Sequence, residues 1–243
     1  MKFISSSNDL SVYLDLNIAK GIPIKNISTD TRNIKKDSLF IAIKGDKFDG
    51  NDFVEEAFEK GASLAIVDNK KLLKIRNTNI VYVKNTIGAL KKISENIIKK
   101  YDGNVIAVTG SNGKTTTTNI IANSLNNSSK TIGNYNNEIG MPLSIINASP
   151  KSKNIVVEIG AAKAGDIDYL SKILNPFIGV ITNIGNSHLE TLKNINKSVR
   201  NIKNLKIIND AGANIYDMMK YKNVLLTQSS VKNLEKRILN EKN

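Results

Sequence analysis

Short apolar runs alternate with a helical pattern in the first third of the chain. Residues 52–60 place their apolar side chains on one side and end at Gly61, which predicts a helix. Runs of four or five apolar residues bounded by polar ones are typical of buried strands, and they lie at residues 39–43, 64–67 and 80–83. Strands that alternate with helices predict a small α/β domain over residues 1–84.

The apolar spacing changes after this segment. Isoleucine and leucine recur every three or four positions over residues 86–101, which predicts an amphipathic helix that bridges into a second domain. Residues 105–108 then form an apolar run that predicts a buried strand, followed by a glycine-bearing loop and a helix from about Thr115. Further strands and a helix are expected at residues 155–157, 178–181 and 165–174. This βαβ pattern predicts a parallel sheet in a second domain over residues 85–243.

The strongest chemical signal lies between that buried strand and the helix after it. The residues that follow Thr109 there are Gly110, Ser111, Asn112, Gly113, Lys114, Thr115 and Thr116. Glycines let the backbone wrap an anion, and the free N–H groups of a helix start point toward it. We therefore expect Lys114 beside the β- and γ-phosphates of ATP, and the Thr115 hydroxyl on Mg²⁺. The general pattern has a glycine where this chain has Val108, so an ordinary turn with a threonine cap is the alternative.

Two further residues follow predicted strands and are candidates for binding the cation. Glu158 ends the run at residues 155–157, and His188, the single histidine, comes after the strand at residues 178–181. The carboxyl ends of parallel strands meet at the ligand crevice of such sheets, and a carboxylate suits a hard cation. The alternatives are a solvated strand-end charge for Glu158 and an ordinary surface or core position for a lone histidine.

A stretch rich in asparagine, residues 134–142, is interrupted by glycine and proline. Its amide side chains, Asn136 and Asn137 among them, both donate and accept hydrogen bonds. Such a loop suits a polar, sugar-like or peptidic substrate. A plain turn is the alternative, because asparagine is common in turns and throughout this chain.

Composition narrows the classes of protein. The formal net charge is +13, but the lysines are dispersed and aromatic residues make up only 5%, so no stacking platform for nucleic acid is expected. There are no cysteines, which excludes disulfides and thiolate metal sites. No apolar run is long enough for a membrane span and the N-terminus does not form a signal peptide, so we expect a soluble cytoplasmic protein without membrane partners.

Together these segments resemble the Mur ligases over roughly residues 25–205. Residues 109–116 match the family's own form of the phosphate loop, which also lacks the early glycine. The amide-rich stretch matches at residues 134–142. Other matching segments are residues 157–160, 181–185 and 187–190, and in the first domain residues 30–32, 37–42 and 45–50.

The resemblance implies an ATP-dependent ligase that adds D-Ala-D-Ala to a UDP-N-acetylmuramoyl-tripeptide through an acyl phosphate, with Mg²⁺ as the metal. Thr115 and Glu158 would bind Mg²⁺, and His188 would bind a second Mg²⁺. The substrate contacts that it implies are Thr31 and Arg32 for the UDP part, with Asn136, Asn137 and Asn183. Lys203 is the candidate for the carbamylated catalytic lysine of the family, with Lys197 and Lys206 as alternatives.

The chain also departs from the family pattern. Asn51 stands where the family tends to have histidine, and Asp166 stands where it has glutamate. No segment after about residue 205 has the length of the family's third domain, so we expect a truncated chain. The alternatives to a complete ligase are a non-catalytic nucleotide-binding remnant and a subunit completed by a separate chain that supplies the third domain; a nucleic-acid-binding protein ranks last.

Overall fold

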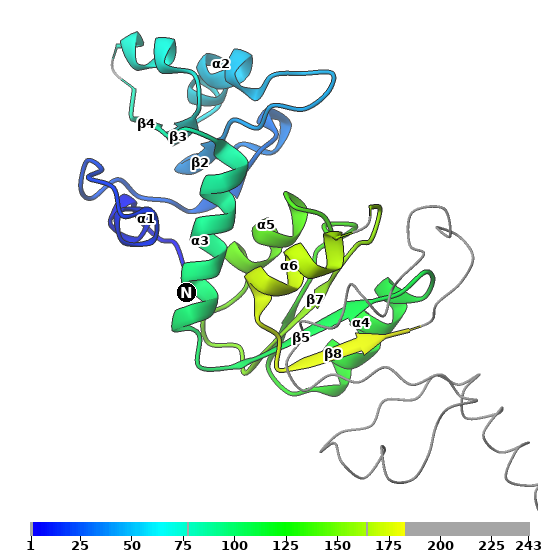
Figure 1. Cartoon of the computed structure of the whole chain (residues 1–243). Coiled ribbons are helices and arrows are strands. Elements are labelled where there is room, and N and C mark those ends of the chain that lie inside the picture. Colours follow the sequence, from blue (N-terminus) through cyan, green and yellow to red (C-terminus); the bar gives the residue numbers. More distant parts are fainter. Residues whose placement is uncertain (1, 77, 164, 183–243) are drawn as a thin grey trace, which may run out of the picture.

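The computed structural model describes residues 2–76, 78–163 and 165–182, and in this part of the chain two parallel β-sheets lie on either side of a long helix (Figure 1). The first sheet has the strand order β1-β2-β3-β4. Its strands are β1 (Asn26–Ser28), β2 (Ser38–Ile41), β3 (Ala62–Val67) and β4 (Ile80–Tyr82). The helices on this side are α1 (Ser7–Leu14) and α2 (Val54–Glu59), with 3-10 turns at Thr31–Asn33, Gly50–Phe53 and Lys70–Lys74.

The second sheet has the strand order β6-β7-β5-β8, and all its strand pairs are parallel. Its strands are β5 (Asn104–Thr109), β6 (Ser128–Lys130), β7 (Asn154–Glu158) and β8 (Ile178–Ile181). Its helices are α4 (Lys114–Ser124), α5 (Gly140–Ile146) and α6 (Asp166–Leu174). Because β5 lies between β7 and β8, the loop that follows β5 is flanked by the ends of both neighbouring strands.

Helices cover both faces of the second sheet, as the alternation of side chains along its strands requires. Val105 and Ala107 of β5 pack on the side of α5 and α6, whereas Ile106 and Val108 pack on the side of α4. A strand that is buried on both faces is apolar without interruption, which is why β5 reads as a continuous apolar run.

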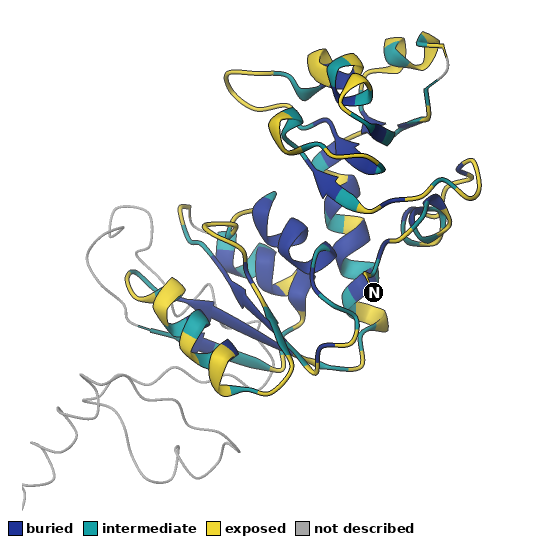
Figure 2. Ribbon diagram, turned by 180° about the vertical axis from the view of Figure 1, so that it is seen from behind, coloured by how far each residue is buried: buried dark blue, intermediate teal, exposed yellow. Residues whose placement is uncertain are grey.

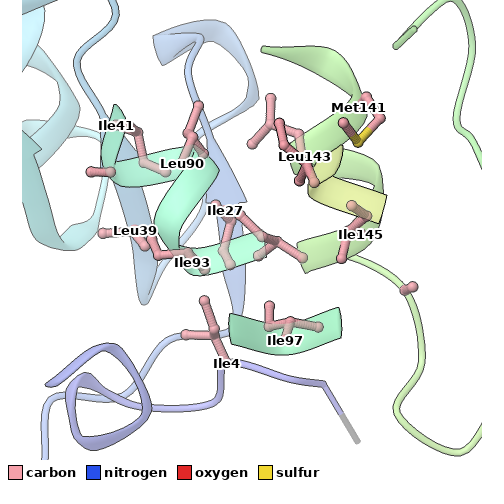
Figure 3. Close-up of a cluster of buried hydrophobic side chains, with 14 of the residues drawn as sticks. Ile4, Ile27, Leu39, Ile41, Leu90, Ile93, Ile97, Met141, Leu143 and Ile145 are labelled. Carbon is pink, nitrogen blue, oxygen red and sulfur yellow. The ribbon is translucent and has the colours of Figure 1, made fainter. Parts of the chain in front are cut away.

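The long helix α3 (Thr86–Lys100) joins the two sheets through one continuous hydrophobic core. The Asn85 side chain begins the helix by accepting a hydrogen bond from the Gly88 N–H at 2.6 Å. Leu90, Ile93 and Ile97 are fully buried along the helix. Figure 3 shows them between side chains of the first sheet and those of α5, and Figure 2 shows the same buried band from behind.

The structure confirms the predicted α/β class with parallel sheets, and each predicted helix and strand of the described residues has a counterpart within a few residues. The pattern did not predict α1, β1 and β6, or α5, which overlaps the end of the amide-rich stretch at residues 134–142. All seven residues of α5 are buried, so it lacks the one-sided pattern by which a surface helix is recognised. Among the described residues, no helix combines the length and the hydrophobicity that a bilayer crossing requires.

Replacing a residue of the shared core should destabilise the whole described fold. We expect Ile93→Ala to lower the free energy of unfolding by about 2–5 kcal/mol, because it leaves a cavity between the two sheets. Lys99→Ala, at an exposed position of the same helix, is the control. It should change the free energy of unfolding by less than about 0.5 kcal/mol. Urea denaturation of the two variants measures both values, and equal midpoints would contradict a core shared through α3.

Candidate active site

The loop between β5 and α4 has the shape that an anion-binding loop requires. The strand ends at Thr109, and α4 begins at Lys114 after Gly113. Gly110 has φ +137° and Gly113 has φ +80°. Residues other than glycine rarely adopt such positive φ angles. The N–H groups in the first turn of a helix have no acceptor within the helix, so those of α4 are available to an anion at its start.

The predicted phosphate-binding lysine lies over this loop. The Lys114 Nζ donates to the backbone carbonyl of Gly110 at 2.8 Å and to that of Ser111 at 3.4 Å. The lysine is half-buried, whereas Asn112, Gly113, Thr115 and Thr116 are exposed. A cation held at the mouth of an exposed loop that leads into a helix start is the arrangement that attracts a polyphosphate.

Glu158 lies beside the start of α4 and is almost fully buried, with 2% of its surface exposed. The Thr115 hydroxyl donates to its Oε2 at 2.7 Å, and the Asn136 amide donates to its Oε1 at 2.7 Å. Its own backbone N–H donates to the Thr131 hydroxyl at 2.8 Å. The structure therefore brings together three of the predicted site residues, Thr115, Asn136 and Glu158, from three separate segments.

The Thr115–Glu158 pair fits a magnesium ion by the chemistry of its atoms. A hydroxyl and a carboxylate are oxygen ligands, which Mg²⁺ prefers, and Mg²⁺ is commonly held by one or two carboxylates together with phosphates and water. Within the described residues, no three His, Cys, Asp or Glu side chains gather around a single point. The pair therefore suits a cation that is shared with a bound nucleotide and not a closed protein cage.

A cleft of about 400 Å³ opens between the phosphate loop and α6. Asn136 and Asn137 line it, although Asn137 also begins α5, since its side chain accepts from the Gly140 N–H at 2.8 Å. Glu138 of the same amide-rich stretch also lines the cleft. The remaining lining residues come from the phosphate loop, the loop after β7, α6 and the end of β8, and include Lys114, Gly160, Lys163, Tyr169 and Ile181.

Tyr169 in the wall of the cleft connects it to α3. The Lys91 ammonium lies 4.8 Å from the centre of the Tyr169 ring. Burial raises the pKa of the Tyr169 phenol, and the negative charges of Glu138 and Glu95 raise it further. The phenol therefore stays protonated and can donate a hydrogen bond in the cleft at neutral pH.

Thr31 and Arg32, the residues predicted for the UDP part, lie in the first-sheet half, outside this cleft. The Thr31 hydroxyl donates to Glu56 at 3.0 Å, and the Arg32 guanidinium pairs with Asp30 at 2.6 Å. The hydrogen bonds from Arg32 lower the pKa of the Asp30 carboxyl. The assignment of Thr31 and Arg32 to the UDP part of a substrate stays a prediction.

Asn51, which departs from the family pattern, is buried next to the same region, with 4% of its surface exposed. Its amide donates to Asp49 at 2.7 Å and to Asp68 at 2.8 Å. These two hydrogen bonds join the loop after β2 to the segment after β3. An asparagine can therefore connect these two loops without a titratable ring at this position.

Several predicted residues lie outside the described residues. These are Asn183, His188 and Lys203, together with the alternatives Lys197 and Lys206.

Sequence reasoning also missed residues that the fold places at the site. Thr131 lies in an unremarkable run and Tyr169 in an ordinary amphipathic helix, so neither carries a local signal. Thr182 lies in the segment 181–185 that resembles the family, but no role was predicted for it.

Two protein-family models match the chain. The model of the Mur ligase middle domain matches residues 108–236, which is more than half of the chain, and the model of the Mur ligase family catalytic domain matches residues 23–124. The phosphate loop, the buried carboxylate and the cleft between them lie in the matched segments. The chain belongs to the Mur ligase family.

Relatives with more specific names are similar to most of the chain. A UDP-N-acetylmuramoyl-tripeptide–D-alanyl-D-alanine ligase of Bacillus subtilis (strain 168) is 40% identical over 172 residues, covering 70% of this chain and 38% of that protein. A ligase of the same name from Buchnera aphidicola subsp. Baizongia pistaciae is 37% identical over 198 residues, covering 80% and 43%. The chain therefore spans less than half the length of the curated relatives it matches.

Solved structures agree with these relatives. The crystal structure of MurF ligase from Thermotoga maritima in complex with ADP is 33% identical with a TM-score of 0.64, and covers 74% of this chain and 43% of that one. A structure of UDP-N-acetylmuramoylalanyl-D-glutamyl-2,6-diaminopimelate–D-alanyl-D-alanyl ligase from Acinetobacter baumannii is 30% identical with a TM-score of 0.70. It covers 82% of this chain and 46% of that one.

The hydroxyl of Thr131 should contribute to the stability of the site. Thr131→Val keeps the shape of the side chain but leaves the buried Glu158 N–H without its acceptor, so we expect a loss of about 1–3 kcal/mol in the free energy of unfolding. Thr117→Val in α4 makes the same chemical change at a half-buried position and should cost less than about 0.5 kcal/mol. Urea denaturation compares the two, and a Thr131→Val variant as stable as the control would exclude this role.

Proposed function

We propose that the protein acts as an ATP-dependent ligase that adds D-Ala-D-Ala to UDP-N-acetylmuramoyl-tripeptide. The observation that carries the proposal is the phosphate loop with Lys114 and the Thr115–Glu158 pair, at the edge of a cleft of about 400 Å³. The names of the curated relatives support the choice of substrates, and the ADP bound in the Thermotoga maritima structure supports the choice of nucleotide.

The proposed reaction has two steps. A carboxylate oxygen of the tripeptide attacks the γ-phosphorus of ATP, which forms an acyl phosphate and releases ADP. The amine of D-Ala-D-Ala then attacks the acyl carbon, and a tetrahedral intermediate loses a proton and inorganic phosphate to leave an amide. In the first step the Lys114 ammonium and the N–H groups of the loop offset negative charge on the transferred phosphoryl group.

Thr115 and Glu158 are the residues that would hold Mg²⁺ next to the phosphates. The ion supplies positive charge to the phosphate oxygens when it is bound. The Asn136 amide keeps the Glu158 carboxylate directed at Thr115, because it occupies the other carboxylate oxygen at 2.7 Å. His188 stays the candidate for a second Mg²⁺.

The remaining roles are proposals of the same kind. Thr31 and Arg32 would contact the UDP part of the substrate, while Asn136, Asn137 and Asn183 would contact its other polar groups. Lys203 would be the carbamylated lysine. Use of ATP would place the reaction in the cytoplasm, and a separate chain could supply what the longer relatives contain beyond the matched residues.

Removal of the loop lysine should weaken nucleotide binding. We expect Lys114→Ala to lower the affinity for MgATP by about 10–100-fold, because charge-assisted hydrogen bonds to phosphate are worth about 1.5–3 kcal/mol. Lys151→Ala removes the same charge from an exposed position before β7, at the opposite edge of the sheet, and should bind MgATP as the unchanged protein does. Isothermal titration calorimetry measures the three affinities.

Two results would contradict the proposal. One is an unchanged protein that is folded but does not bind MgATP, and the other is an equal loss of affinity in both lysine variants. In the second case the net charge of the protein, and not the loop, would explain binding. Formation of the amide product from UDP-N-acetylmuramoyl-tripeptide, ATP and D-Ala-D-Ala then tests the substrates.

The carboxylate should determine how strongly magnesium assists binding. We expect Glu158→Gln to weaken MgADP binding about tenfold and to leave the affinity for ADP in EDTA unchanged, because Gln carries no charge for the cation. Glu138→Gln, at an exposed position of the same cleft, is the matched control. Titrations of ADP with magnesium and in EDTA measure both affinities. An equal loss of ADP affinity in EDTA would contradict a role through magnesium and indicate a general disturbance of the loop.

A further inference from the structure

The carbonyl groups of the phosphate loop are held by donors of the protein. The Lys114 ammonium donates to the carbonyls of Gly110 and Ser111. The Gly113 carbonyl accepts the Thr117 N–H at 2.9 Å, as the first backbone hydrogen bond of α4. These donors all come from the loop itself or from the helix that follows it.

The two other carbonyls of this segment are held by Thr182, which directly follows β8. The Thr182 N–H donates to the Thr109 carbonyl at 2.9 Å and continues the ladder between β5 and β8. The Thr182 hydroxyl makes its shorter contact with the Asn112 carbonyl and lies 3.3 Å from the Thr109 carbonyl. Thr182 therefore holds the Asn112 carbonyl from outside the motif.

The orientation of the Asn112 carbonyl matters because an anion site needs its N–H groups turned inward and its carbonyl groups turned away. The peptide between Asn112 and Gly113 precedes a glycine, which adopts positive and negative φ with similar ease, so its orientation is not fixed by the residue type. Gly113 has φ +80°, and a Cβ added there would lie 3.9 Å from the Thr182 side chain. The Thr182 hydrogen bond to the Asn112 carbonyl opposes rotation of this peptide.

We propose that Thr182 is a positioning residue for the nucleotide. Its hydroxyl keeps the Asn112 carbonyl away from the interior of the loop and so directs the Gly113 N–H toward the bound phosphate. The inference rests on the proposed function, because it assumes that the loop binds ATP and ADP.

The role differs from that of Lys114 in a way that the geometry explains. When a phosphate enters, the lysine can exchange the carbonyls of Gly110 and Ser111 for phosphate oxygens, because its flexible side chain is part of the loop. Thr182 is fixed by the backbone ladder with β5 and carries no charge, so its hydrogen bond stays with the loop in both states.

Two substitutions of Thr182 test the role of its hydroxyl: valine removes the hydroxyl and serine keeps it. We expect Thr182→Val, which keeps the shape of the side chain, to weaken MgADP binding about tenfold, and Thr182→Ser to stay within about twofold of the unchanged protein. Calorimetry gives the affinities, and thermal denaturation shows whether the variants are folded. In ¹⁵N-labelled protein, MgADP should shift the Gly113 amide signal in the unchanged protein and in Thr182→Ser, and much less in Thr182→Val.

The outcomes separate this inference from the proposed function. Equal MgADP affinity in the unchanged protein and a folded Thr182→Val variant would overturn the role of Thr182 and leave the proposed function intact. A loss of affinity in Thr182→Ser as large as in Thr182→Val would overturn it too. Absence of MgADP binding to the unchanged protein would overturn both. If Thr182→Val does not fold, Thr182→Ala replaces it with the same expectation.

Discussion

The register of the second sheet is the constraint on which the site depends. β5 and β7 pair in parallel with Val108 opposite Glu158, and β5 and β8 pair with Thr109 opposite Ile181. Three strands therefore end at one edge of the sheet, next to the phosphate loop. A shift of one residue would turn the Glu158 carboxylate to the other face of the sheet and away from the Thr115 hydroxyl.

That register is held by burial on both faces of the sheet. The helices α5 and α6 cover one face and pack in turn on α3, and α4 covers the other face. Because α3 also packs on the first sheet, the position of the first-sheet half relative to the phosphate loop is set by one shared core and not by a flexible linker. The Lys91–Tyr169 contact extends this connection to the wall of the cleft.

The buried carboxylate gives the site its chemical character. A nearly inaccessible Glu158 is costly to place in a protein unless its oxygens accept hydrogen bonds, and Thr115 and Asn136 provide one for each oxygen. The same two oxygens and the threonine hydroxyl are ligands suited to magnesium. The hydrogen bonds that stabilise the carboxylate without a ligand are thus those that position it for one.

Sequence by itself determined the α/β class, the phosphate loop and the strand-end position of Glu158, because apolar spacing and glycine placement act over a few neighbouring residues. It did not reveal α5, which is buried on all sides, or the roles of Thr131 and Tyr169. Contacts such as those of Thr182 with a loop about seventy residues earlier depend on strand order and register. Only the tertiary structure decides these, since the burial of both sheet faces, and no local pattern, selects one pairing of the strands.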